Sequence, residues 1–541
     1  MKINKSIVKG AAFASTAALI LVGCSGDPES DTTADGTTAT SEAIILANGS
    51  EPENPLIPTN TNEVGGGRIL DSIFAGLVYY DAEGTAHNDV AESIEQIDPT
   101  KYEVTIAEGW QFTNGEPVTS SSFVDAWNYG ALLSNAHNSS YFFEDIEGFS
   151  WDEDSELTGL EIIDEQTFTI TLNKPASDFP QRLGYSAFYP LPAVALEDME
   201  AFGQMPIGNG PYMIDGEDAW QHDVQIDLTV NPDYQGERVP DNDGLRFTFY
   251  ASQDAAYADL LANNLDVLDG IPDSALATYE SDLGDRAINQ PAAVFQSFTI
   301  PERLDHFSGE EGQLRRMALS MAINREQITD VIFEGTRTPA SDFTSPVVDG
   351  WSESLEGGEV LEYNESEAQA AWAEANEISQ WDGTFELAYN ADGGHQAWVD
   401  ATVNSIRNVL DIEVEGYPYA TFAELREDVS TDAIQTSFRT GWQADYPGLY
   451  NFLGPLYATN AGANDGDYSN SEFDARLEAG ITAEDPATAN DEFQAAQEIL
   501  LEDLPAIPLW YANVNGGYSE SVSNVVFDWH SVPLYYEITK N

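Results

Sequence analysis

The clearest helical pattern in the chain is Leu314-Arg315-Arg316-Met317-Ala318-Leu319-Ser320-Met321-Ala322-Ile323-Asn324-Arg325. Its apolar residues are three and four positions apart, and the same spacing continues through Ile328, Val331 and Ile332. This periodicity predicts one amphipathic helix over about 314–333. Gly335 then supplies a residue suited to the end of a helix.

Outside this stretch the pattern is a mixture of strands and helices. Tyr102–Ile106, Phe168–Leu172 and Phe247–Tyr250 are predicted strands, the first two because apolar and polar residues alternate along them. Glu365–Ile378 and Trp398–Leu410 are predicted helices. No fixed-period repeat and no long linker follows Ser41. The sequence therefore indicates an α/β protein whose lobes are interwoven rather than strung in a row.

Composition limits what such a protein can do. The chain has 541 residues, of which 42% are hydrophobic, enough for a core shared among two or three lobes. It carries 20 Lys and Arg against 94 Asp and Glu, a net charge of −74. Binding of nucleic acid through clustered cations is excluded by this balance. The acidity fits a saline habitat, which stays an open interpretation.

The N-terminus reads as an export signal that ends at the only cysteine of the chain. Three lysines precede Ala11–Val22, an apolar run too short for an ordinary spanning helix. Leu21-Val22-Gly23-Cys24 resembles the bacterial lipobox, whose cysteine becomes lipidated after cleavage. We therefore expect a lipoprotein signal peptide at 1–23 and a flexible tether at 24–41, which has no large apolar residue. The alternative is an ordinary secretory signal with a cysteine there by chance.

Sequence motifs for catalysis and metal binding are missing. The chain has no His-Glu-x-x-His, no Gly-x-Ser-x-Gly and no phosphate-binding loop, and its six histidines are scattered. A single cysteine rules out an internal disulfide and a multi-cysteine zinc site. We therefore predict no catalytic residue, no metal site and no cofactor. The many carboxylates still leave a glycosidase-type acid pair open.

Several short motifs, taken together and in order, resemble family 5 of the extracellular solute-binding proteins. No one of them is decisive, but their order covers nearly the whole chain after the tether. They are Asn48–Glu51, Arg68–Asp81, Gly109–Val118, Phe123–Trp127, Gly208–Tyr212, Asn231–Tyr234 and Leu314–Arg325. Within this family the likeness is greatest to the oligopeptide-binding proteins of ABC importers.

The resemblance implies a fold of the periplasmic-binding-protein type, class II, cluster C. Two α/β lobes are then joined by a hinge and accompanied by an extra inserted domain. On this reading lobe I comprises residues 42–78, 196–300 and 515–541, the inserted domain comprises 79–195, and lobe II comprises 301–514. Closure of the lobes around a ligand is the expected motion.

The resemblance also implies where a ligand lies. Arg439–Pro447 resembles the family's ligand-holding segment, in which an aspartate matching Asp445 pairs with the α-ammonium of a peptide. The main chains of Gly441 and Gln443 would pair with the ligand backbone as a neighbouring strand does, and Val64 would pair on the opposite side. Trp442 is either a pocket wall or an ordinary core residue.

Further cationic and polar positions match residues that meet the carboxylate end of a peptide. Arg439 lies six residues before Asp445, and His395 lies in a second ligand-lining segment that also includes Asn390. The planar guanidinium of arginine suits a carboxylate because it can donate two parallel hydrogen bonds. Arg303 is a weaker candidate. The stretch Pro447–Leu449 departs from the family's more polar pattern, which leaves peptide length and side-chain preference undetermined.

The function implied is capture of oligopeptides outside the cytoplasm and their delivery to the permease of an ABC importer. The protein would be a monomer held to the membrane by lipidated Cys24, with no nucleic-acid partner. Dipeptides, nickel chelates and oligosaccharides are alternative ligands for the same fold. A secreted hydrolase and a surface adhesion or signalling protein are alternatives of other classes.

Overall fold

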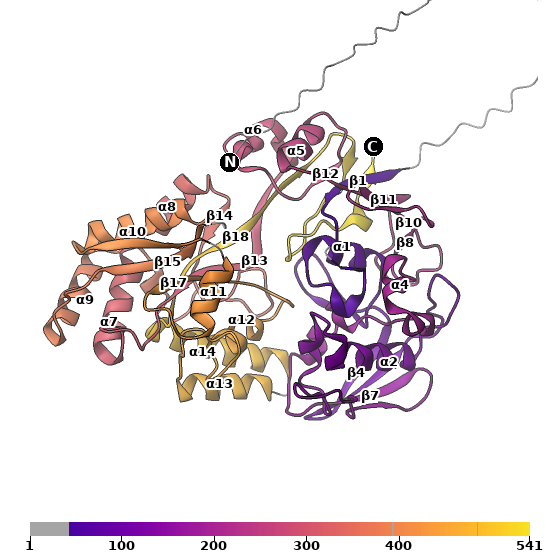
Figure 1. The fold of residues 1–541 in the computed structure, drawn as a ribbon, viewed down its shortest axis with the longest axis horizontal. Helices are drawn as coiled ribbons and strands as arrows, with labels where there is room; N and C mark the ends of the chain where they lie inside the picture. Colours follow the sequence, from indigo (N-terminus) through magenta and orange to yellow (C-terminus); the bar gives the residue numbers. More distant parts are fainter. Residues whose placement is uncertain (1–42, 53, 392–393, 421, 484) are drawn as a thin grey trace, which may run out of the picture. The chain divides into compact units, whose positions relative to one another are not determined.

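The computed structural model describes residues 43–541 except 53, 392–393, 421 and 484. The predicted signal peptide, the tether and Cys24 lie outside the described residues. Most of the strands belong to one mixed sheet, which Figure 1 shows crossing the described part of the chain. Its strands are, in spatial order, β16 (Val414–Tyr419), β15 (Phe385–Asn390), β17 (Ser437–Gln443), β13 (Ala287–Thr299), β18 (Ala506–Tyr518), β12 (Val267–Leu268), β1 (Ile44–Gly49), β11 (Gly244–Phe249), β10 (Gln225–Val230) and β8 (Tyr212–Ile214).

Short strands extend this sheet and form smaller ones. β14 (Arg337–Pro339) pairs with β18, and β9 (Trp220–Gln221) pairs with β10. The separate sheets are β4 (Ala91–Asp98), β5 (Lys101–Ile106), β7 (Thr167–Thr171) and β6 (Leu160–Ile162); β2 (Val78–Tyr80) with β3 (Ala86–Asn88); and β19 (Val522–Ser523) with β20 (Thr539–Lys540).

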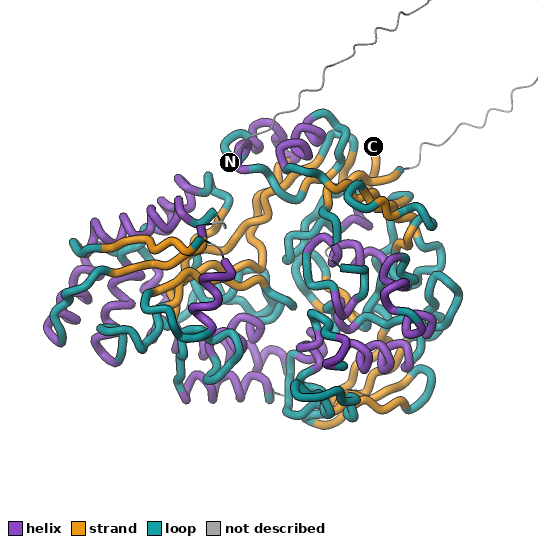
Figure 2. The backbone as a smooth tube through the Cα atoms, in the orientation of Figure 1, coloured by secondary structure: helices purple, strands orange, loops and turns teal. Residues whose placement is uncertain are grey.

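Helices lie beside these strands, as the purple and orange segments of Figure 2 show. The helices are α1 (Val64–Ile73), α2 (Ser120–Ala131), α3 (Phe179–Arg182), α4 (Met199–Gln204), α5 (Gln253–Leu261), α6 (Tyr279–Leu283), α7 (Gly309–Met321), α8 (Arg325–Ile332), α9 (Glu365–Ile378), α10 (Gln396–Leu410), α11 (Phe422–Ser430), α12 (Leu449–Tyr457), α13 (Ser471–Ile481) and α14 (Pro486–Asp503).

Two long antiparallel strands, β13 and β18, connect the two ends of the large sheet (Figure 1). Their register runs from Ala287 opposite Gly517 to Thr299 opposite Ala506, with irregularities after Pro291 and Gln296. Buried apolar side chains form one large cluster mainly from residues 45–267 and another mainly from 293–511. A smaller cluster comes from residues 256–283. Both ends of the sheet are therefore built on their own buried cores.

The predicted strands and two of the predicted helices are confirmed by β5, β7, β11, α9 and α10. The single helix predicted over about 314–333 is wrong, because the structure has two helices there, α7 and α8. Asn324 ends the continuity, since its side-chain oxygen accepts a hydrogen bond from the N–H of Gln327 at 3.0 Å and caps α8. Gly335 follows α8 with a left-handed φ of 76°.

The arginines of the opening motif are buried structural residues. Arg315 and Arg325 are 0% and 3% exposed. The guanidinium of Arg315 pairs with Glu311 at 2.7 Å and lies over the ring of Trp372. Arg325 donates to the main-chain oxygens of Pro508 at 2.8 Å and Leu361 at 2.5 Å, and to Ser320. These contacts hold α7 and α8 against β18 and the segment before α9.

Candidate functional site

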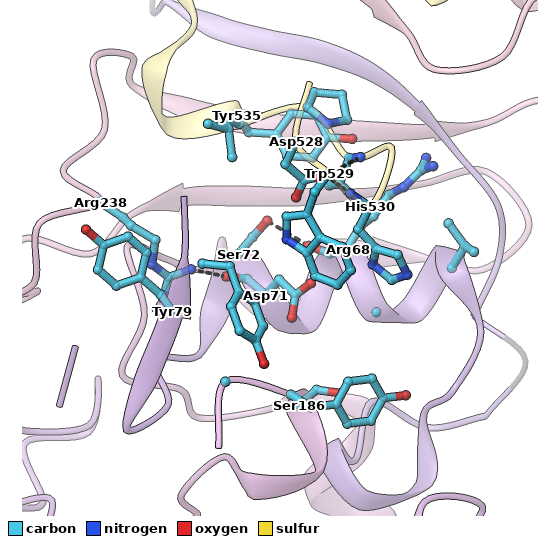
Figure 3. A pocket seen from close by; sticks show the side chains of 18 of the residues that line it. Arg68, Asp71, Ser72, Tyr79, Ser186, Arg238, Asp528, Trp529, His530 and Tyr535 are labelled. Atoms are coloured by element: carbon cyan, nitrogen blue, oxygen red, sulfur yellow. Dashed lines mark hydrogen bonds between the residues drawn. The ribbon is translucent and has the colours of Figure 1, made fainter. Parts of the chain in front are cut away.

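A cavity of about 260 Å³ lies where distant parts of the chain meet. Helix α1 contributes Arg68 and Asp71, and Asp445 comes from the segment just after β17. The C-terminal loop around Asp528 and Trp529 also lines the cavity, as do residues between 79 and 238. Figure 3 shows the α1 side chains and those of the C-terminal loop pointing into the same space. Residues more than 370 positions apart thus line one cavity.

Strand β17 presents one unpaired edge beside this cavity. Along one side, residues 438–443 pair with β13, whereas β15 pairs on the other side only at Ser437 and Phe438. Within the described residues, no strand covers that second edge from 441 to 443. The N–H of Ala444 donates to Ala293 of the β13 side at 2.9 Å. Main-chain groups alternate in direction along a strand, so those of Gly441 and Gln443 face the unpaired edge.

Asp445 follows this strand and is only partly exposed. Asn451 donates its side-chain N–H to the carboxylate at 3.1 Å. Among the described residues, no Lys, Arg or His lies within ion-pair distance of this carboxylate. Burial raises the pKa of Asp445, and the hydrogen bond from Asn451 acts in the opposite direction. The cavity therefore contains a desolvated acid without a countercharge in the described chain.

Three tyrosines lie near enough to this carboxylate to feel its charge. The negative charge of Asp445 contributes to raising the pKa of Tyr80, Tyr141 and Tyr185, after burial as the main cause. Tyr80 lies in β2, Tyr141 in the short helix Ser140–Phe143, and Tyr185 just after α3. Aromatic faces carry partial negative charge and attract cations. A carboxylate among such rings is suited to an ammonium group.

The other charges of the cavity are mostly balanced by contacts inside the protein. The guanidinium of Arg68 pairs with Asp269, and that of Arg238 pairs with Asp89 at 3.0 Å. Asp528 accepts hydrogen bonds from two main-chain N–H groups, and burial raises its pKa to about 7. Burial lowers the pKa of His530 to about 4, so this ring is neutral at pH 7. The cavity offers no unpaired cation for an anionic ligand within the described residues.

A second cavity of about 240 Å³ lies along residues 438–442 of β17. It is lined by Arg439, Gly441 and Trp442, together with apolar rings such as Phe422. The guanidinium of Arg439 donates to the side-chain oxygen of Asn390 at 2.9 Å and lies over the ring of Phe422. The structure thus brings two of the predicted ligand-binding residues, Arg439 and Asn390, into contact.

The remaining predicted site residues are placed less centrally. His395 precedes α10 and its ring accepts a hydrogen bond from the indole of Trp398 at 3.1 Å, and it lines neither cavity. Val64 lines the first cavity as the first residue of α1, so its N–H belongs to the unpaired first turn of the helix. Arg303 pairs with Asp467 at 2.8 Å and lines neither cavity.

Asn451 and most of the residues that line the first cavity are not among the site residues predicted from the sequence. Asn451 is 2% exposed, and its side chain contacts both Trp442 and Asp445. An isolated amide in the apolar run Leu449–Tyr457 was the available signal. Asp71 and Asp528 gave none, because only the fold brings α1 next to the C-terminal loop.

The residues that the structure describes have neither a membrane-spanning helix nor a cluster of metal-binding side chains. No helix there is both long and apolar enough to cross a bilayer. No cluster of three or more His, Cys, Asp or Glu side chains there is placed to hold a metal ion.

Comparison with known proteins defines the class. Solved structures with this fold include the murein tripeptide-binding protein MppA in its unliganded open form, with a TM-score of 0.80, 20% identity and coverage of 92% of this chain and 99% of that one. OppA of Haemophilus influenzae in complex with the peptide RPPGFSPFR gives a TM-score of 0.69, 20% identity and coverage of 92% and 99%. The fold is therefore that of the two-lobed periplasmic binding proteins, as predicted.

Sequence comparison gives the family. The model of the bacterial extracellular solute-binding proteins, family 5, matches residues 85–464. This chain belongs to that family, which consists of solute-binding proteins. The oligopeptide-binding protein OppA of Bacillus subtilis is 22% identical over 498 residues, covering 87% of this chain and 88% of its own length. The dipeptide-binding protein DppE of the same organism is 23% identical and covers 90% of both.

Proposed function

We propose that this protein captures oligopeptides outside the cytoplasm and delivers them to an ABC importer, without catalysing a reaction. One observation carries the proposal: an unpaired strand edge at 441–443 runs directly into a desolvated carboxylate, Asp445, that has no countercharge among the described residues. A peptide in extended form carries both complements, a backbone edge and an ammonium group. Relatives named as oligopeptide- and dipeptide-binding proteins support the same ligand class.

The ammonium end is recognised by Asp445. A buried ion costs several kcal/mol unless it is paired and hydrogen-bonded, so a fixed acid in this cavity stabilises a free amino terminus and disfavours a blocked one. The phenol rings of Tyr80, Tyr141 and Tyr185 add attraction for a cation. Recognition therefore sets the register of the peptide from its first residue.

The peptide backbone pairs with Gly441 and Gln443 on the unpaired edge of β17, and the N–H of Val64 meets it from α1. Such pairing uses groups that every peptide has, so affinity depends little on side chains. Trp442 forms a wall of the second cavity. Arg439, held by Asn390, meets the terminal carboxylate of ligands long enough to reach that cavity, and His395 serves ligands of another length.

The protein is also proposed to be attached to a membrane and to consist of two lobes and an inserted domain. Lipidated Cys24 holds the monomer to the membrane through the tether at 24–41. Lobe I (42–78, 196–300 and 515–541) and lobe II (301–514) close on the ligand, with 79–195 as the inserted domain. Contacts made only in the closed state drive that motion.

Binding of a defined peptide library tests the ligand class. Purified protein, unfolded and refolded to remove any carried ligand, is incubated with synthetic tri- to hexapeptides and with the same peptides acetylated at the N-terminus. We expect retention of the free-amino peptides, at an affinity about tenfold or more above that of the acetylated ones, since blocking removes the charge that pairs with Asp445. Mass spectrometry of the retained fraction measures both.

Other results would point elsewhere. Equal retention of both libraries would contradict recognition of the amino terminus. Retention of a nickel chelate or an oligosaccharide, with no peptide retained, would assign the protein to another ligand class. Cleavage products in catalytic amounts would make it a hydrolase.

A further inference from the structure

The side chain of Asn451 links two residues of the ligand-binding segment. It projects from α12 and is 2% exposed. Its Oδ1 accepts hydrogen bonds from the indole Nε1–H of Trp442 and from the main-chain N–H of Asp445, both at 3.0 Å. Its Nδ2 donates to the Asp445 carboxylate at 3.1 Å. One buried amide thus contacts a wall of the second cavity and the acid of the first.

These contacts leave only one orientation for the amide. Two N–H donors converge on Oδ1, and an amide nitrogen cannot accept either of them. The NH₂ group must therefore face the carboxylate, where it acts as a donor. A leucine has a similar size but could satisfy none of the three partners, and a serine is too short to reach all of them.

We propose that Asn451 is a positioning residue for ligand recognition: it holds the Asp445 carboxylate toward the cavity in its ionised form and fixes it relative to Trp442. The inference rests on the proposed function, because the ionised carboxylate is what an ammonium ligand needs. Asn451 itself does not line either cavity. It acts on the ligand through Asp445.

Asn451 affects ligand affinity through the protonation state of the Asp445 carboxylate. Burial raises the pKa of Asp445, and the Asn451 hydrogen bond is the opposing contribution, so its loss raises that pKa further. Charged and titratable groups also line this cavity: Glu63, Arg68, Asp71, Tyr79, Tyr80, Tyr185, Tyr189, Tyr212, Arg238, Asp528, His530, Tyr535 and Tyr536. Tyr141 adds a further phenol near Asp445. The pKa values of Tyr80, Tyr141 and Tyr185 are raised, so these phenols stay uncharged between pH 4 and 9.

The pH dependence of peptide affinity in Asn451→Leu and Asn451→Ser tests the inference. Affinity falls at low pH as Asp445 takes up a proton, and this acid midpoint should lie higher in both variants than in the wild type. At pH 7 we expect affinity to fall about two- to tenfold, because a carboxylate that Asn451 no longer holds must be ordered when the ligand binds. Asn231→Leu is the matched control. Asn231 is buried, donates its side-chain N–H to the main-chain oxygen of Gly210 and lines neither cavity, so its replacement should leave the midpoint in place.

A second readout does not need a ligand. Carbon NMR of the Asp445 carboxyl group should show its pKa shifted upward in Asn451→Ser relative to the wild type. An unchanged carboxyl titration, or a loss of affinity that is equal at every pH, would overturn the positioning role. Failure of the wild type to bind any peptide would instead contradict the proposed function, while the NMR titration still decides the role of Asn451.

Discussion

Replacing Asp445 by alanine is expected to lower the affinity for free-amino peptides by about thirtyfold to several thousandfold. Removal of one partner from a buried, hydrogen-bonded charge pair costs about 2–5 kcal/mol, largely because the other charge stays buried and unpaired. No described Lys, Arg or His is close enough to compete for this carboxylate, so the ligand's ammonium is its only proposed countercharge. Isothermal titration calorimetry of one library peptide measures the loss.

The matched control is Asp71→Ala. Asp71 lines the same cavity but already accepts a hydrogen bond from the hydroxyl of Tyr189 at 2.8 Å. Its removal should cost clearly less than removal of Asp445. Equal losses for the two variants would show that the cavity attracts cations by its overall charge, without a specific anchor.

Replacing Arg325 by methionine is expected to lower the free energy of unfolding of the core around α8 by about 3 kcal/mol or more. The change removes the guanidinium donor from the buried main-chain oxygens of Pro508 and Leu361, at about 1–3 kcal/mol each, whereas that of Ser320 keeps the N–H of Ile323. Relief of burying the guanidinium offsets part of this cost. Urea denaturation followed by tryptophan fluorescence measures the change, since Trp510 and Trp398 belong to the same core.

Arg476→Met serves as the control for this variant. Arg476 forms a 2.8 Å ion pair with Glu492 at the surface, with 43% of its side chain exposed. Exposed pairs of this kind contribute little to stability, because water and salt screen them. A similar midpoint for Arg325→Met and Arg476→Met would show that the buried hydrogen bonds contribute little.

Local pattern was sufficient to predict the regular elements. Alternation at Tyr102–Ile106 and helical spacing at Glu365–Ile378 show which face of each element is buried. This information lies in residues that are close together in the sequence. The break at Asn324 was missed because one capping side chain outweighed the apolar periodicity on both sides of it. Hydrophobic spacing indicates which residues are buried, but it does not indicate where a capping side chain starts a new helix.

The site was only partly predictable for a related reason. The segment 439–445 is contiguous, so its resemblance to a family motif located Asp445, Gly441 and Gln443 together. The opposite wall combines α1 with the loop at 528–536, and no local pattern connects positions so far apart. The role of Asn451 also depends on a turn that returns α12 to the end of β17.

The pairing of β18 has a consequence for any shortened form of this protein. That strand pairs with β13 along one edge and with β14 and β12 along the other. A product terminated before residue 506 would lose the strand that joins both ends, and bare backbone edges would be left on β13 and β12. Such a fragment should aggregate instead of surviving as a functional half.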